Sequence, residues 1–182
     1  KNNLVTHKLE TTLQFLSIDA SNIHEENKLL AAYAIEEFLP KDKVLSSLED
    51  YKGVKRRFET IFENENFKLI DDFAHHPTAI DETIKMATEQ TDNLILIIEL
   101  GSNSMKKGIH DERLLNIFKN QNVYTINASA NQREIFANYA QELTKADVAK
   151  ICTTEAKKKT ILMCGNRNFQ GFQKLILDEL IK

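Results

Sequence analysis

From residue 58 onward, short apolar segments alternate with longer segments in which apolar residues recur at helical spacing. The apolar segments have the length and side-chain types of β-strands, and most are nearly continuous in hydrophobic residues. The predicted strands are residues 58–62, 67–71, 93–100, 123–128 and 160–165. The predicted helices are residues 78–90, 111–120, 133–145 and 172–182. This alternation predicts an α/β fold with a mostly parallel sheet covered by helices on both faces.

The chain before this region follows a different pattern. Residues 1–20 alternate weakly between apolar and polar side chains, as an edge strand or a hairpin does. Residues 23–38 carry apolar side chains at helical spacing, and Pro40 ends that predicted helix. A short second helix is predicted over residues 42–51. We therefore expect one α/β domain from about residue 50 to the C-terminus, preceded by a piece of another domain.

Sheets of this kind bind ligands in the loops beyond the carboxyl ends of their strands. Four loops occupy those positions, and three of them are polar. They are residues 71–77, 99–108, 127–132 and 165–171. We expect the functional residues of the domain in these loops.

The glycine content excludes two common ways of binding nucleotides. The chain has five glycines, about 3% against a usual ~7%. Neither a G-x-x-x-x-G-K-[ST] loop nor a G-x-G-x-x-G turn is present in the sequence. The chain therefore brings no glycine-rich phosphate cradle of its own.

Charge and cysteines set further limits. The net charge of −3 gives no long-range attraction to nucleic acid or to anionic lipid. No apolar run approaches the ~18 residues of a membrane span, and no signal peptide follows Lys1. Cys152 and Cys164 both lie in apolar segments, where a buried thiol is expected rather than a disulfide. We expect a cytoplasmic protein without nucleic-acid or membrane partners, and the start at Lys1 allows for a piece of a longer one.

The loop after the second predicted strand reads DDFAHH (residues 71–76), with two aspartates and two histidines side by side. Thr78 and Asp81 predict a helix N-terminus directly after it, where a bound phosphate is favourable. Carboxylates accept hydrogen bonds from ribose hydroxyls, and imidazoles donate to phosphate. Two other interpretations remain, a polar loop of incidental histidines and a zinc site. Adjacent histidines without cysteine partners disfavour zinc.

Cationic side chains are concentrated in three further segments. Residues 55–57 (KRR) precede a predicted strand, and one guanidinium aimed at the same ligand as Asp72 would form an arginine clamp for a phosphoryl group. The first two cations of this run are interpreted as a solvated patch. Residues 101–107 (GSNSMKK) and 166–168 (NRN) place polar and cationic groups after two apolar strands. An ordinary loop with solvated lysines remains an alternative for residues 101–107.

Together these segments resemble a known family. DDFAHHPTAI, with KRRFE before it and IELGSNSMKKGI after it, closely resembles the C-terminal domain of the Mur ligases, and among them the murein peptide ligases. CGNRNFQGFQKLI resembles the closing strand, loop and helix of that domain, and the resemblance begins near Asn27. It implies a Rossmann-like C-terminal domain over residues 41–182. It further implies that residues 1–40 are the tail of a central ATP-binding domain.

The resemblance also implies an activity. Mur ligases use ATP and Mg²⁺, and their glycine loop and metal ligands lie mainly in the central domain. We therefore expect an ATP-dependent amide-bond ligase that joins recycled L-Ala-γ-D-Glu-meso-diaminopimelate to UDP-N-acetylmuramate, and expect this chain alone to be inactive. The alternatives are a UDP-N-acetylmuramate–L-alanine ligase and a stand-alone nucleotide- or peptide-binding module. An NAD-dependent oxidoreductase is disfavoured by the missing glycine fingerprint.

Matched residue by residue, the resemblance implies nucleotide contacts for five residues. Arg57 corresponds to an arginine near the ATP phosphates, and Asp72 to an aspartate that holds the ribose. Phe73 and His75 line the nucleotide beside it, and Asn27 lies near adenine. Arg57, Asp72 and His75 are the catalytic residues that we expect, and no metal ligand is expected within this chain.

A second group is expected to bind the incoming peptide. It consists of Ser102, Asn103, Lys106 and Arg167. Gly101 stands where the murein peptide ligases usually carry an arginine. If the family's arginine binds a carboxylate of diaminopimelate, that contact is lost here or passes to Lys106, Lys107 or Arg167.

Overall fold

The computed structural model describes residues 23–35, 37–51 and 53–182, and they group into two compact units. One unit ends at Gly53, and the other runs from Val54 to Lys182. The edge strand or hairpin predicted over residues 1–20 lies outside the described residues. None of the described helices is long and apolar enough to cross a membrane.

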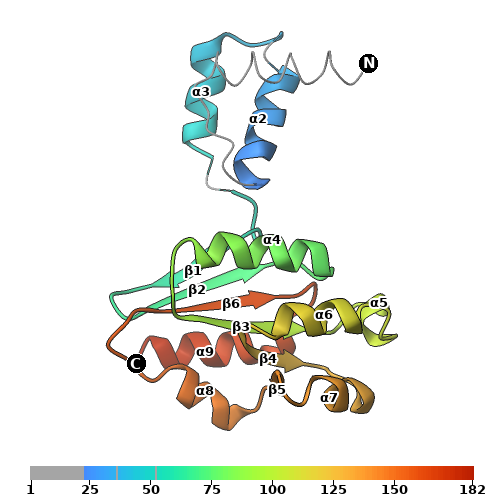
Figure 1. The fold of residues 1–182 in the computed structure, drawn as a ribbon. Coiled ribbons are helices and arrows are strands. Elements are labelled where there is room, and N and C mark those ends of the chain that lie inside the picture. Colours follow the sequence, from blue (N-terminus) through green and yellow to red (C-terminus); the bar gives the residue numbers. More distant parts are fainter. Residues whose placement is uncertain (1–22, 36, 52) are drawn as a thin grey trace. The chain divides into compact units, whose positions relative to one another are not determined.

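The first unit contains a pair of helices, α2 (Ile23–Ile35) and α3 (Lys41–Glu49), as the apolar spacing predicts (Figure 1). Ala32 and Val44 are buried where the two helices pack. Helix α2 ends three residues earlier than predicted, because the N–H groups of Phe38 and Leu39 turn back to donate to the carbonyl oxygen of Ile35. Pro40, which cannot continue a helix, becomes the N-cap of α3.

The second unit is described throughout, and its elements alternate along the chain. Its strands are β1 (Glu59–Glu63), β2 (Phe67–Asp72), β3 (Leu94–Glu99), β4 (Asn122–Ile126), β5 (Ala140–Glu142) and β6 (Lys159–Cys164). Its helices are α4 (Pro77–Thr88), α5 (Asn103–Lys106), α6 (Asp111–Phe118), α7 (Ala130–Phe136), α8 (Lys145–Ile151) and α9 (Phe172–Leu180), with the short 3-10 helix η1 (Phe169–Gly171) before α9. The strand order is β1-β2-β6-β3-β4-β5. Only β1 is antiparallel to its neighbour, so the predicted mostly parallel sheet is confirmed.

The strands alternate side chains between two hydrophobic cores. On β3, Leu96 and Ile98 face one core, whereas Ile95 and Ile97 face the other. The first core is completed by α4, α6 and α7, and the second by α8 and α9. In Figure 1, α4 and α6 lie on one face of the sheet and α8 and α9 on the other. The predicted coverage of both faces is therefore confirmed, and it explains why the central strands are apolar on both sides.

The helix predicted over residues 133–145 is wrong in part. Ser129 and Gln132 form a capping box that starts α7 at Ala130, and α7 ends at Phe136. The chain then pairs with β4 as the edge strand β5, and a second capping box at Thr144 starts α8. The apolar residues of this segment fit helical spacing, but strand pairing and the two capping boxes determine its structure.

The loops predicted to hold a site emerge at one edge of the sheet. Strands β2, β6, β3 and β4 are parallel neighbours, so their carboxyl ends lie side by side. Since β1 is antiparallel and Glu59 pairs with Asp71, the segment before β1 reaches the same edge. Among the described residues, positive φ angles in residues other than glycine occur only in these segments. They are found at Arg56, Phe58, Asn127, Phe169 and Gln170. Such conformations are costly, and they cluster at functional sites.

Candidate functional site

Arg56 has a structural role at the edge of the sheet where the parallel strands end. Its Nε donates to the buried carboxylate of Asp71 at 3.2 Å, and its Nη2 donates to the carbonyl oxygen of Gly165 at 2.7 Å. The guanidinium also lies 5.3 Å from the ring centroids of both Phe73 and Phe169. The interpretation of Arg56 as a solvated cation is therefore wrong, because its donors and its π face are already engaged.

Arg57 has the opposite character. Its side chain is exposed, and its guanidinium lies 5.2 Å from the centroid of the Phe73 ring. Among the described residues, that guanidinium has no hydrogen-bond or ion-pair partner. The positive φ angles of Arg56 and Phe58 on either side fix the local backbone in a strained turn. Arg57 thus presents a positive charge, packed against an aromatic ring and free to bind an anion.

Asp72 holds this strained turn in place. The residue is 4% exposed, and its Oδ2 accepts a hydrogen bond from the N–H of Phe58 at 2.7 Å. Its Oδ1 accepts from the N–H of Ala74 at 2.7 Å, with the hydroxyl of Thr83 at 3.4 Å. One carboxylate therefore ties the segment that carries Arg57 to the loop that carries Phe73. The predicted ribose contact of Asp72 would have to use lone pairs left by these bonds.

Phe73 and His75 lie together at the end of β2. Both are partly buried, and their rings meet edge to face with centroids 5.4 Å apart. Nδ1 of His75 lies 3.0 Å from the carbonyl oxygen of Phe73. A carbonyl only accepts, so Nδ1 is the donor in this contact, and Nε2 remains for a ligand. The structure thus places Arg57, Asp72, Phe73 and His75 near one another.

The N-terminus of α4 adjoins this group. The helix begins at Pro77, and Nδ1 of His76 accepts a weak hydrogen bond from the N–H of Thr78 at 3.4 Å. The helix N-terminus predicted from Thr78 and Asp81 is therefore confirmed in place but not in its cap, because the N-cap is His76 and the helix begins at Pro77. His76 meets the ring of His110 at 4.7 Å between centroids. Partial desolvation and the nearby His110 lower the pKa of His76 from its usual 6.5. Within the described residues there is no cluster of three acidic, histidine or cysteine side chains able to hold a metal ion.

The loop after β3 divides the predicted peptide-binding residues. Ser102 is buried and its Oγ accepts from the N–H of Met105, so it serves as the N-cap of α5. Asn103 and Lys106 are exposed, and their side chains form no hydrogen bond within the described part of the chain. Helix α5 was not predicted, because the composition of this segment is typical of a turn. The side chains of Asn103 and Lys106 are on its exposed side.

Arg167 lies on the loop after β6, next to the loop after β3. Its N–H donates to Oε2 of Glu99 at 3.1 Å, and its Nε donates to the carbonyl oxygen of Gly101 at 2.8 Å. Glu99 ends β3, is 1% exposed, and has no partner for its Oε1 among the described residues. A Cβ at Gly165 would lie 2.7 Å from Cβ of Glu99 and 2.9 Å from the ring of Phe169. Close packing therefore requires glycine at position 165.

Sequence reasoning missed Glu99 and Gly165. The one signal for Glu99 is an acidic residue at the end of an otherwise apolar strand, at the edge where ligands are expected. The remaining predicted residue, Asn27, is exposed on α2 in the first unit. Its nucleotide contact stays a prediction.

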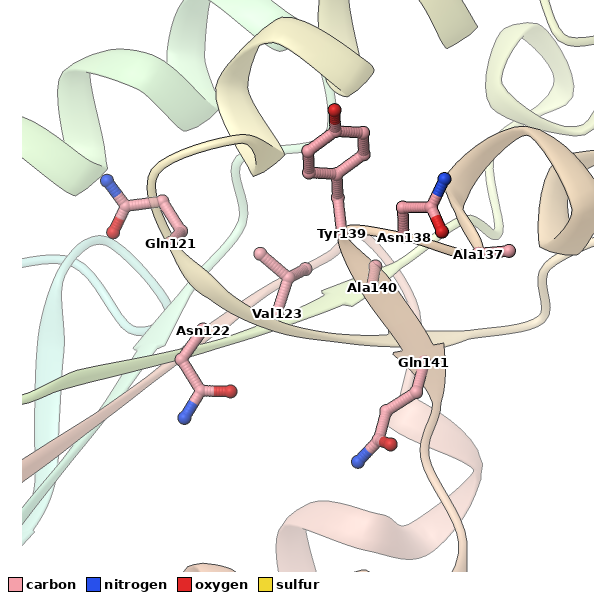
Figure 2. Close-up of a pocket in the computed structure, with 8 residues that line it drawn as sticks. All are labelled: Gln121, Asn122, Val123, Ala137, Asn138, Tyr139, Ala140 and Gln141. Atoms are coloured by element: carbon pink, nitrogen blue, oxygen red, sulfur yellow. The ribbon is translucent and has the colours of Figure 1, made fainter.

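A separate cavity of about 280 Å³ lies at the amino ends of β4 and β5. It is lined by Gln121, Asn122, Val123, Ala137, Asn138, Tyr139, Ala140 and Gln141. Figure 2 shows Tyr139 on one side of this cavity, with Asn122 and Gln141 extending to the other, so the polar groups do not converge. The cavity contains none of the predicted site residues.

Comparisons with known proteins agree with this geometry. The family model described as "Mur ligase, glutamate ligase domain" matches residues 56–167, more than half of the chain. The UDP-N-acetylmuramate–L-alanine ligase of Campylobacter jejuni (strain RM1221) is 39% identical over 74 residues, which cover 41% of this chain and 15% of the relative. The corresponding ligase of Desulfitobacterium hafniense is 40% identical over 79 residues, covering 42% and 18%. The chain thus spans less than a fifth of the length of these curated relatives.

Solved structures show the same likeness. A murein peptide ligase from Psychrobacter arcticus superposes with a TM-score of 0.61 at 30% identity, over 89% of this chain and 38% of that one. A pseudomurein peptide ligase type C from Methanothermus fervidus gives 0.57 at 25% identity, over 86% and 35%. The family match spans the loops of β2, β3 and β4 and reaches Arg167. The chain therefore belongs to the Mur ligase family and carries that family's C-terminal domain.

Proposed function

We propose that this chain belongs to an ATP-dependent ligase that joins an amino acid or a peptide to UDP-N-acetylmuramate through an amide bond. Its domain closes over the bound nucleotide and binds the acceptor, which is the incoming amino acid or peptide. The observation that carries the proposal is the Arg57 guanidinium, which has no hydrogen-bond partner among the described residues and is held against Phe73 by the hydrogen bonds of Asp72. Membership of the Mur ligase family supports the reaction class.

The residues present fit the triphosphate end of a nucleotide. Arg57 offers free planar donors, and the N-terminus of α4 adds partial positive charge nearby. His75 and the ring of Phe73 offer a ribose or base a polar ring nitrogen and a flat surface. When bound, ATP supplies the phosphoryl group that activates a substrate carboxylate. The chain's own residues orient the phosphates and exclude water when the domain closes.

Mg²⁺ needs ligands from elsewhere. Oxygen ligands and water surround this ion in proteins, commonly with one or two carboxylates. In the described part of the chain, Asp71 already binds Arg56, and Asp72 binds main-chain N–H groups. We therefore assign the metal ligands to a central domain, outside the described residues.

Two acceptor substrates are candidates for this ligase. The 30% identity to the Psychrobacter arcticus murein peptide ligase over most of the chain favours L-Ala-γ-D-Glu-meso-diaminopimelate recovered from the cell wall. The 39% identity to L-alanine ligases over 74 residues favours free L-alanine. We favour the peptide, because the likeness to the peptide ligase covers more of the chain.

An amide-ligation assay of the full-length gene product tests the proposal. The protein is mixed with ATP, Mg²⁺ and UDP-N-acetylmuramate and with either the tripeptide or L-alanine, and the product is identified by mass. Product from the tripeptide supports the peptide ligase, and product from L-alanine alone supports the alternative. Nucleotide binding without turnover for any acceptor would replace the ligase with a binding module.

A further inference from the structure

We propose that Arg167, whose side chain occupies the space that Gly101 leaves open, binds the carboxylate of the incoming amino acid or peptide. This inference rests on the proposed ligase function and names the residue that selects its acceptor.

Arg167 is fixed at two points, and both anchors belong to the end of β3. Its main-chain N–H donates to Oε2 of Glu99 at 3.1 Å, and its side-chain Nε donates to the carbonyl oxygen of Gly101 at 2.8 Å. A guanidinium fixed through Nε has lost much of its rotamer freedom before any ligand arrives. Binding an anion then costs less conformational entropy.

The absence of a side chain at position 101 makes this placement possible. A Cβ there would lie 2.8 Å from Cδ of Arg167 and 3.2 Å from its Nε. Gly101 does not have a positive φ angle, so its backbone does not require glycine. The glycine is needed for space, and the space is filled by Arg167.

The donors of Arg167 that face outward are free. The residue is exposed, and among the described residues Nη1 and Nη2 have no hydrogen-bond partner. Two free N–H groups on a planar fork match the two oxygens of a carboxylate. Lys106, the other cation predicted for this role, is exposed on α5 with no contact that fixes its ammonium.

Neighbouring groups favour a carboxylate with N–H donors over a phosphate. Oε1 of the buried Glu99 and the buried Oδ1 of Asn166 lack hydrogen-bond partners in the described part of the chain. Amino acids and peptides bring N–H groups as well as a carboxylate, whereas a phosphate brings only acceptors and more negative charge beside Glu99. The other fixed arginine, Arg56, donates to the carbonyl oxygen of Gly165, two residues before Arg167.

The test is steady-state kinetics of the full-length gene product with Arg167→Gln and Gly101→Ala. The first variant removes the guanidinium, and the second keeps it but displaces it with a methyl group. We expect both to raise KM for the acceptor, roughly 10- to 100-fold for Arg167→Gln, with KM for ATP within about twofold of wild type. Lys119→Gln, an equal loss of charge beyond the end of α6, is the matched control.

A second arm uses the same acceptor with its carboxylates converted to carboxamides. The wild-type enzyme should then lose the affinity that Arg167 provides, and Arg167→Gln should cause no further loss. An active enzyme in which Arg167→Gln leaves the acceptor KM unchanged, or changes KM for ATP instead, would overturn this inference and leave the ligase function standing. Wild-type protein that ligates no acceptor would overturn the ligase function, and this inference with it.

Discussion

Asp72 accepts a hydrogen bond from the main-chain N–H of Phe58 at 2.7 Å, across the boundary between the end of β2 and the turn before β1. The same carboxylate accepts from Ala74 at 2.7 Å. Because Arg57 precedes Phe58, the buried carboxylate of Asp72 determines where the exposed guanidinium of Arg57 lies. The structure therefore separates positioning residues from residues free to contact a ligand.

Replacing Asp72 with Asn should destabilise the protein and disorder the turn before β1. The amide keeps one acceptor, but its NH₂ group faces a main-chain N–H, so one donor loses its partner and a donor–donor contact arises. We expect a loss of about 1–3 kcal/mol in the free energy of unfolding, measured by urea denaturation, together with reduced ligase activity. The exposed Asp81→Asn should cost at most about 0.5 kcal/mol. Wild-type stability in Asp72→Asn would show that these hydrogen bonds do not hold the turn.

Replacing Arg57 with Gln should affect activity without affecting stability. Its guanidinium has no hydrogen-bond partner among the described residues, so the free energy of unfolding should change by less than about 0.5 kcal/mol. In the full-length gene product we expect ligase turnover to fall at least about tenfold, because the proposed phosphate contact would be lost. Lys55→Gln removes the same charge two residues away and should leave turnover near wild type. Equal effects of the two variants would contradict a specific role for Arg57.

Replacing the adjacent Arg56 with Gln should have the reverse profile. The buried carboxylate of Asp71 loses its ion pair, and the carbonyl oxygen of Gly165 loses its donor. Since Arg and Gln are equally strained at the positive φ of residue 56, the backbone contribution cancels. We expect a loss of about 1–3 kcal/mol by urea denaturation. A stable Arg56→Gln variant would show that this pair does not hold the site together.

His76 should titrate below its usual pKa of 6.5. A pKa lowered by folding means that protonation opposes the folded state. The stabilising contribution is therefore complete above pH 6.5 and is lost as the pH falls through the lowered value. NMR titration of the ring C–H resonances measures this pKa directly. Removing the neighbouring imidazole with His110→Asn should raise the pKa of His76 part of the way, since desolvation remains. A wild-type value at or above 6.5 would contradict this account.

Much of the fold follows from the sequence because burial on both faces leaves strong apolar signals. Strands such as Leu94–Glu99 and Lys159–Cys164 are fixed by hydrophobic residues on both sides of the sheet. The edge strand Ala140–Glu142 escapes prediction because it has one neighbour and a weak apolar pattern. Thr144 and Asp147, three residues apart, were the available signal for α8.

The site was only partly predictable, because charge alone does not reveal which cation is engaged. From the sequence, Arg56 is interpreted together with Lys55 as a solvated cation, but the fold gives Arg56 a buried partner and, among the described residues, leaves the Arg57 guanidinium without a hydrogen-bond partner. The engagement of Arg56 depends on Asp71 and Gly165 and on the rings of Phe73 and Phe169. All four are separated from Arg56 by more than ten residues of sequence. Contacts of this kind follow from tertiary packing and leave no local pattern.

Gly165 also limits how the domain can evolve. Any side chain at this position would collide with Glu99 and Phe169, and its carbonyl oxygen anchors Arg56. A Cβ at Gly101 would lie 2.8 Å from Cδ of Arg167, so a side chain at position 101 requires Arg167 to move. We therefore expect ligases of this family that select different acceptors to change positions 101 and 167 together, and to keep glycine at position 165, where a side chain would disturb both Glu99 and the loop that anchors Arg56.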